Sequence, residues 1–123
     1  MEGKPIRVFN HGKRRRDFTY IDNVIQANKK SLFTDKADAL NQVYNVGAGH
    51  RTTLNELWSE IRSLTGIHKD AIYGPVRPGD VPHSLADITK ARILLGYDPE
   101  YSVTDGLRLA AEWYTAHLSP SPK

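Results

Sequence analysis

The sequence Arg77-Pro78-Gly79-Asp80, followed by His83-Ser84-Leu85-Ala86-Asp87-Ile88, combines a tight turn, two opposite charges and the beginning of a helix. Pro followed by Gly is typical of a turn, so the arginine and the carboxylate should lie close together at the surface. Asp87 is a residue type that caps helices, and Gly96 is typical of the position just after a helix end. Apolar residues follow the cap at helical spacing, namely Ile88, Ala91, Leu94 and Leu95. We therefore predict a charged turn and then a short helix.

Extended segments and helices alternate on both sides of this stretch. The extended segments are expected at residues 6–9, 18–21, 43–46 and 72–73. A first helix should be capped by Asp22 and should pack one apolar side, formed by Ile25, Leu32 and Phe33.

Two further helices have clear start signals. One should begin at the capping box Thr53-Leu54-Asn55-Glu56 and end at Gly66. The last should open at Ser102-Val103-Thr104-Asp105. Its inward side would consist of Leu107, Ala110, Ala111, Tyr114 and Leu118. The alternation predicts an α/β unit with a small mixed sheet.

The composition is that of one ordinary globular domain. The chain has 123 residues, of which 39% are hydrophobic and 25% charged, so it can bury a core. We predict a domain over residues 1–118 and a flexible Ser/Pro tail over residues 119–123. No apolar run approaches the roughly 20 residues of a membrane helix and no signal peptide is visible, so we predict a cytoplasmic location without membrane contact. The absence of cysteine excludes disulfides and thiolate chemistry.

The charge of the chain raises the question of nucleic-acid binding. The formal net charge is +3, and the sharpest basic run is Lys13-Arg14-Arg15-Arg16. Elsewhere both signs are mixed, and no aromatic residues surround the run in RNA-binding spacing. We therefore predict no nucleic-acid partner and interpret the run as a solvated turn with one functional arginine. The five histidines show no paired helical spacing, so no metal site is predicted.

Two motifs that suggest chemistry are interpreted as structural. Gly47-Ala48-Gly49 begins like a dinucleotide fingerprint, but Thr52 occupies the place of the third glycine, so a tight turn is favoured. His83 and Ser84 are neighbours in sequence, and neighbouring side chains diverge, so turn or pocket-wall roles are favoured over nucleophilic catalysis. No Tyr-x-x-x-Lys pair occurs in the chain.

Arg16, Arg77 and Asp80 are the candidate binding residues. Guanidinium groups bind phosphate oxygens in a bidentate manner and a carboxylate accepts from vicinal hydroxyls, so the set suits a ligand with two phosphates and a sugar diol. The alternative is a surface salt bridge between Arg77 and Asp80, which would contribute little stability. The residues alone leave both interpretations open. For Phe9, which ends an apolar segment, they favour core packing.

Several motifs spread over nearly the whole chain occur in the order and spacing of one known family. They are Ile6-Arg7-Val8-Phe9, Arg16-Asp17-Phe18-Thr19-Tyr20-Ile21-Asp22, Val43-Tyr44-Asn45-Val46-Gly47, Arg77-Pro78-Gly79-Asp80, Ala86-Asp87, Leu94-Leu95-Gly96-Tyr97-Asp98-Pro99 and Trp113-Tyr114. With these motifs the chain resembles the extended short-chain dehydrogenase/reductase family, specifically the NAD-dependent nucleotide-sugar epimerases and dehydratases. Residues 10–13 look closer to UDP-glucuronate 4-epimerases, whereas residues 49–57 and 83–87 look closer to UDP-N-acetylglucosamine 4-epimerases. The sugar stays open, with a preference for the second group because its matching text is longer.

The resemblance implies the C-terminal substrate-binding domain of such an enzyme without its Rossmann half. In the family, the Rossmann half holds NAD and the catalytic Tyr-x-x-x-Lys, so no cofactor and no catalytic residue are expected in this chain itself. The resemblance places Phe9 against uracil, Arg16 and Arg77 at the pyrophosphate, and Asp80 at the ribose hydroxyls of a UDP-sugar. The expected partners are a UDP-sugar, a Rossmann half and a second copy bound through exposed apolar surface.

The chain would then bind a UDP-sugar without turning it over. The competing interpretation is a stand-alone module that binds nucleotide-sugars or another protein without catalysis. A Rossmann-encoding reading frame immediately upstream would favour the first interpretation, and an isolated gene would favour the second.

Overall fold

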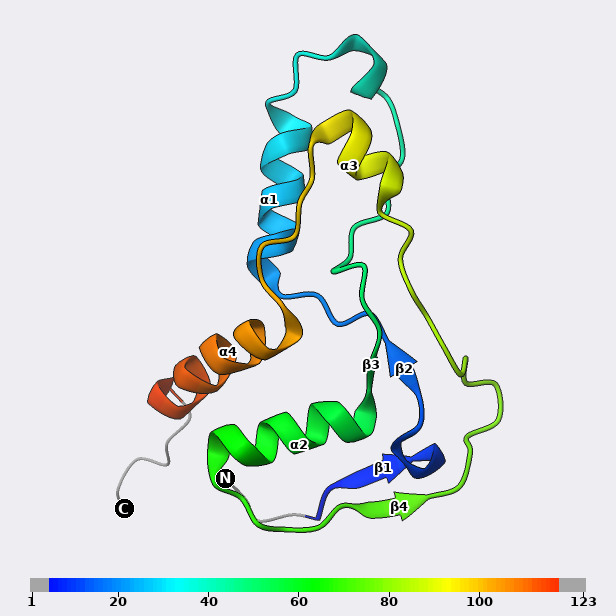
Figure 1. Cartoon of the computed structure of the whole chain (residues 1–123), viewed down its shortest axis with the longest axis vertical. Helices are drawn as coiled ribbons and strands as arrows, with labels where there is room; N and C mark the ends of the chain where they lie inside the picture. The colour runs from blue at the N-terminus through cyan, green and yellow to red at the C-terminus, as the bar shows by residue number, and fades with distance from the viewer. Residues whose placement is uncertain (1–4, 118–123) are drawn as a thin grey trace.

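The structure of the protein is a computed structural model that describes residues 5–117. Figure 1 shows an elongated molecule in which α1 and α3 lie side by side at one end, and β1 and β4 lie at the other. In chain order the elements are β1 (Arg7–Phe9), the single-turn helix η1 (Asn10–Gly12), β2 (Arg15–Arg16), α1 (Ile21–Leu32), the single-turn helix η2 (Ala37–Ala39), β3 (Thr52–Thr53), α2 (Leu54–Thr65), β4 (Ile72–Gly74), α3 (Thr89–Leu95) and α4 (Val103–His117). The predicted α/β class is confirmed.

The strands form two small pairs. β1 pairs in parallel with β4, with Phe9 opposite Gly74, and β2 pairs antiparallel with β3. The segment after the 77–80 turn also joins β2. The backbone N–H of Arg15 donates to the carbonyl of Pro82 at 3.2 Å, and the N–H of Ser84 donates to the carbonyl of Arg15 at 3.2 Å. β2 therefore lies between β3 and the segment that follows the charged turn.

The apolar core is small and lies between α1 and α3. Its buried members are Ala27, Ile88, Ala91 and Tyr97. The Tyr97 hydroxyl donates to the carbonyl of Gly47 at 2.7 Å, so this buried polar group has a partner. Burial raises the pKa of Tyr97 above its ordinary value. Asp87 accepts from the N–H of Thr89 at 3.0 Å, so its side chain bonds to the first residue of α3.

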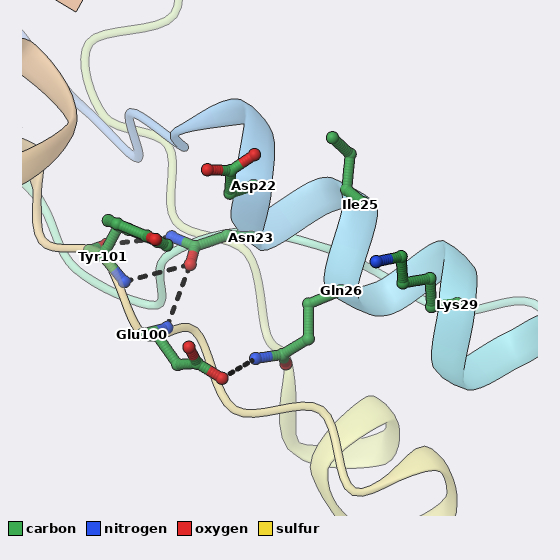
Figure 2. Close-up of a pocket in the computed structure, with 7 residues that line it drawn as sticks. All are labelled: Asp22, Asn23, Ile25, Gln26, Lys29, Glu100 and Tyr101. Atoms are coloured by element: carbon green, nitrogen blue, oxygen red, sulfur yellow. Dashed lines mark hydrogen bonds between the residues drawn. The ribbon is translucent and has the colours of Figure 1, made fainter. Parts of the chain in front are cut away.

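Two amide side chains on α1 hold the connection between α3 and α4 (Figure 2). Asn23 is buried, and its Oδ1 accepts from the N–H groups of Glu100 at 2.9 Å and Tyr101 at 3.1 Å. Gln26 binds both backbone groups of Asp98, donating to the carbonyl at 2.7 Å and accepting from the N–H at 2.9 Å. These bonds satisfy backbone groups of a segment that belongs to no helix or strand.

Capping boxes begin both α2 and α4. The Thr53 hydroxyl accepts from the N–H of Glu56 at 3.1 Å, and the Glu56 carboxylate accepts from the N–H of Thr53 at 2.7 Å. Ser102 and Asp105 repeat this arrangement before α4. The C-cap of α2 is Gly66, whose φ of 66° is the left-handed conformation that glycine adopts readily. These predicted boundaries are confirmed.

The predicted strand at residues 43–46 is wrong. Among residues 5–117 no strand pairs with this segment, and Val43 is exposed. Its side chains bind other parts of the chain instead: the Tyr44 hydroxyl donates to the carbonyl of Ala39 in η2 at 2.7 Å, and the Asn45 amide donates to the carbonyl of Asp87, just before α3, at 3.3 Å. A β-rich run becomes a strand only where a second strand offers a ladder of hydrogen bonds.

The start of α1 and the burial of two helices also differ from the prediction. α1 begins at Ile21, so Asp22 lies in its first turn and is not the cap, and residues 18–20 belong to no strand. Leu32 and Phe33 are exposed, as is Tyr114 of α4, because other described elements do not cover these faces. Leu118 and the predicted tail lie outside the described residues.

Candidate functional site

The four predicted binding residues come from three segments that the strands hold together. Phe9 ends β1, Arg16 ends β2, and Arg77 and Asp80 lie on the turn that follows β4. The pairing of β1 with β4 places this turn beside Phe9, and the N–H of Asn10 donates to the carbonyl of Pro75 at 3.3 Å. The four side chains form two contacting groups, one around Asp80 and one around Phe9.

Asp80 receives two arginines of the basic run. Its Oδ2 lies 2.9 Å from Nη1 of Arg14, and its Oδ1 lies 3.5 Å from Nη2 of Arg16. The alternative sequence interpretation, an ion pair between Arg77 and Asp80, is not what the structure forms. The turn is closed through the backbone instead, where the N–H of Asp80 donates to the carbonyl of Arg77 at 3.4 Å.

The Arg77 side chain lies on an aromatic ring. Its guanidinium carbon is 4.0 Å from the centroid of the Phe9 ring, a cation–π contact. Phe9 is half-buried, and Gly74 on β4 approaches the same ring, since a Cβ at that glycine would lie 3.1 Å from a ring carbon. Phe9 is therefore not a core residue: its half-buried ring stacks against the Arg77 guanidinium.

Sequence reasoning missed Arg14, the most buried charged residue of this site. Only 3% of Arg14 is exposed, and its guanidinium donates to the carbonyls of Val81 at 3.1 Å and Arg77 at 3.4 Å as well as binding Asp80. Its Nε is buried without a partner among residues 5–117. A signal was available, because side chains two positions apart in an extended segment share a face, which places Arg14 with Arg16.

The site keeps binding capacity after these internal contacts. Three guanidinium groups, those of Arg14, Arg16 and Arg77, stand against the single Asp80 carboxylate, so positive charge is in excess. A carboxylate offers about four acceptor positions, and Asp80 is 38% exposed with one arginine on each oxygen. Arg16 is 28% exposed and uses its donors on Asp80 and on the carbonyl of Arg15. Both groups can take further partners from solvent.

The Gly47–Gly49 turn is filled from inside the protein. Asp17 accepts from the N–H groups of Ala48 at 2.8 Å, Gly49 at 3.0 Å and Ala86 at 3.2 Å. A Cβ at Gly47 would lie 2.6 Å from an Asp17 oxygen, so the turn closes tightly around this carboxylate. Donors that a dinucleotide fingerprint directs at a pyrophosphate are here directed at Asp17. This turn does not fit NAD, in agreement with its interpretation as a structural turn.

Several pockets lie elsewhere on the described part of the chain. Four pockets among residues 5–117 are lined by residues other than Phe9, Arg16, Arg77 and Asp80. Within residues 5–117 there is no group of three or more His, Cys, Asp or Glu side chains that could hold a metal ion, and no helix is both long and apolar enough to span a membrane.

Comparison with known proteins gives a consistent set of matches. The family model described as GDP-mannose 4,6 dehydratase matches residues 2–110. A UDP-glucuronate 4-epimerase of Thermodesulfobacterium geofontis is 33% identical over 113 residues, which are 91% of this chain and 34% of that protein. The chain thus spans about a third of the length of the curated relatives it matches.

Solved structures match with similar coverage. A UDP-glucose 4-epimerase from Thermotoga maritima, crystallised with UDP-glucose, has a TM-score of 0.85 and 36% identity, covering 95% of this chain and 37% of that one. A UDP-glucuronic acid 4-epimerase from Bacillus cereus, in complex with UDP-glucuronic acid and NAD, has a TM-score of 0.79 and 33% identity, covering 94% and 36%. The resemblance seen in the sequence is confirmed, and that related structure contains NAD.

Proposed function

This chain belongs to the GDP-mannose 4,6 dehydratase family, and from that premise we propose that it holds the UDP portion of a nucleotide-sugar. It would serve as the C-terminal substrate-binding part of an NAD-dependent UDP-sugar 4-epimerase and would not catalyse the reaction alone. UDP-N-acetylglucosamine and UDP-glucuronate are the proposed sugars, in that order. The proposed partner is a Rossmann domain of the kind that makes up the rest of such enzymes.

The observation that carries this proposal is the cluster around Asp80. Arg14 and Arg16 bind the two oxygens of one half-exposed carboxylate, and the same turn presents Arg77 on the Phe9 ring. A pyrophosphate needs cations, a ribose diol needs an acceptor and a base needs an apolar ring face. All three kinds of group occur here side by side on segments that the two strand pairs hold in place.

Each residue then has a distinct role. Arg16 keeps donors for a phosphate oxygen while one of its nitrogens stays on Asp80. Asp80 accepts from the ribose hydroxyls with the acceptor positions that its arginines leave open. Arg77 lies where a base stacked on Phe9 would come, so we propose that UDP binding moves this guanidinium from the ring to the pyrophosphate. The exchange replaces a cation–π contact by a charge-assisted hydrogen bond, which is the stronger of the two.

The residues present supply no site for the redox step. The Gly47–Gly49 turn is closed around Asp17, and the chain has no Tyr-x-x-x-Lys pair to hold and move a proton. NAD, when bound in the family, supplies hydride transfer. In this chain the described residues bind and orient the nucleotide, and no chemical step is assigned to them.

The proposal is tested by comparing UDP with uridine. Both ligands are titrated into the 15N-labelled chain, and affinities are taken from amide shifts. UDP should bind more tightly, and added salt should reduce the difference because phosphate contacts are electrostatic. Arg77→Ala should cost about 1.5–3 kcal/mol of UDP affinity, roughly tenfold to a hundredfold, and should not weaken uridine. Asp80→Asn should weaken both ligands alike.

Arg108→Ala is the matched control, since this arginine of α4 is exposed and pairs with Glu112 in its own helix. It removes the same charge outside the site and should leave both affinities unchanged. Equal weakening of UDP and uridine by Arg77→Ala would show that Arg77 does not contact phosphate. The pure chain with NAD should not interconvert UDP-N-acetylglucosamine or UDP-glucuronate and their 4-epimers; turnover would contradict the non-catalytic assignment.

A further inference from the structure

A pocket lined mainly by polar residues borders β2, and neither Arg14, Arg16 nor Asp80 lines it. It has a volume of about 500 Å³ and is bordered by η1, the β2–β3 pair, the start of α2 and the segment after the charged turn. Figure 1 shows these elements meeting near β2 and the beginning of α2. The polar side chains among its lining residues are those of Lys13, Arg15, His83, Asn10, Thr53 and Asn55.

Strand geometry divides the basic run between two sites. Successive side chains of an extended segment point to opposite faces. Arg14 and Arg16 accordingly reach the same Asp80 carboxylate, whereas Arg15 between them lines the pocket. Lys13, which has a helical backbone conformation at the end of η1, lines the pocket as well. The parallel bridge between Arg15 and His83 brings the histidine to the same pocket. The sequence therefore contains two interleaved pairs of cations, and only one pair serves the Asp80 cluster.

The cations of the pocket are not used by the fold. Among residues 5–117, no hydrogen bond or ion pair engages the side chains of Lys13, Arg15 or His83, and no Asp or Glu lines the pocket. Glu56 interacts electrostatically with Arg15 but does not line the pocket, and its Oε2 accepts from both the N–H and the hydroxyl of Thr53 in the capping box. The other three pockets differ: two contain carboxylates and one is mostly apolar.

Hydrogen bonds within the protein support one wall of the pocket. Asn10, His11 and Gly12 have φ values of 54°, 49° and 71°, a run in the left-handed region that needs support from its surroundings. Asn55 supplies it: its amide donates to the carbonyl of His11 at 3.0 Å and its oxygen accepts from the Tyr73 hydroxyl at 3.1 Å. A side chain at position 12 would collide with Asn55, so the glycine is required there.

We propose that this pocket is a second binding site, separate from the UDP site, for a small molecule that carries a phosphate group. Arg15 and Lys13 would bind the phosphate oxygens, Arg15 through its planar fork and Lys13 as a point charge. A single phosphate leaves most of a pocket of this size free, so the neutral side chains Asn10 and Thr53 would border the rest of the molecule. The site uses no residue of the UDP proposal and stands whether or not UDP binds.

The test uses the 15N-labelled chain and inorganic phosphate as the probe, at constant ionic strength, first alone and then with UDP present. Backbone shifts of Gly12, Lys13, Thr53 and His83 should change and saturate in both titrations. Arg15→Gln should weaken phosphate binding about tenfold, the loss of one charged hydrogen bond. Lys13→Gln should weaken it in the same direction, and neither variant should change UDP affinity.

Arg7→Gln is the matched control, because Arg7 is exposed on β1 and does not line the pocket. It changes the net charge equally and should leave phosphate binding intact. Shifts that do not saturate, or equal weakening by Arg15→Gln and Arg7→Gln, would overturn the proposal. The proposal would also be overturned if UDP and phosphate competed and Arg15→Gln weakened the binding of both, since the cations would then form one site. Failure of UDP to bind would refute the UDP proposal alone, because the phosphate titration without UDP still tests the phosphate site.

Discussion

Replacement of Arg14 by glutamine should destabilise the protein much more than the same replacement at Arg16. Arg14 is 3% exposed and binds Asp80 together with two backbone carbonyls around the charged turn. Arg16 is 28% exposed and lies 3.5 Å from the other oxygen of the same carboxylate. Both variants remove one positive charge, so a general charge effect would be equal in the two.

The expected loss of unfolding free energy follows from the groups that Arg14→Gln leaves without a partner. Breaking a buried charge pair by removing one partner costs about 3–5 kcal/mol. Asp80 is 38% exposed and keeps Arg16, so water and that arginine compensate part of the loss. Glutamine also retains a donor for one carbonyl. We therefore expect a loss of about 2–3 kcal/mol in the free energy of unfolding for Arg14→Gln, and less than about 1 kcal/mol for Arg16→Gln, as for exposed pairs.

Urea unfolding followed by circular dichroism measures both values. With a slope of about 2 kcal/mol per molar urea, Arg14→Gln should lower the midpoint by about 1 M or more, and Arg16→Gln by less than half of that. Similar midpoints for the two variants would refute the reasoning that burial distinguishes these arginines. A variant of Arg14 that fails to fold would agree with it, because Arg16→Gln supplies the folded reference.

Three further outcomes are expected. Hydrogen bonds from Thr53 lower the pKa of Glu56, so the charged carboxylate stabilises the fold above the unfolded pKa of about 4.3, and this contribution is lost as pH falls through the lower folded pKa. The difference in unfolding free energy between wild type and Glu56→Gln should therefore shrink between about pH 5 and pH 3. A difference that stays constant over this range would contradict the expectation. Gly47→Ala should lower the free energy of unfolding by about 1–3 kcal/mol, because its Cβ would lie 2.6 Å from an oxygen of Asp17. Gly79→Ala has open space around its Cβ and should cost only the strain of a left-handed backbone. Equal losses of stability in the two variants would show that the contact with Asp17 does not cause the loss at position 47. The chain should self-associate through its exposed apolar side chains, among them Phe33 at 79% and Trp113 at 54%, and light scattering that shows a strict monomer at high concentration would count against this.

The candidate site could be proposed from sequence because its members belong to a recognisable motif. Arg16, Arg77 and Asp80 were selected as candidates in that way, and Phe9 was added by the family resemblance. Their mutual arrangement could not be predicted, since an Arg77–Asp80 pair and a ligand-binding set fit the same residues equally well. The structure places Asp80 on Arg14 and Arg16, and Arg77 on Phe9. Which partner a charged side chain chooses depends on the strand pairing, and this brings together residues 60 or more positions apart.

The sequence by itself determined the helix boundaries that depend on near neighbours. The capping boxes at Thr53 and Ser102, and the glycines at positions 66 and 96, act within four residues, so their physics is local and readable. Tertiary structure alone decided whether residues 43–46 became a strand, because a ladder needs a second strand that the segment did not meet. It also decided the role of Asp17, whose three backbone donors come from residues 31 to 69 positions away. A carboxylate binds whatever donors the fold brings to it, and no local pattern records which ones those will be.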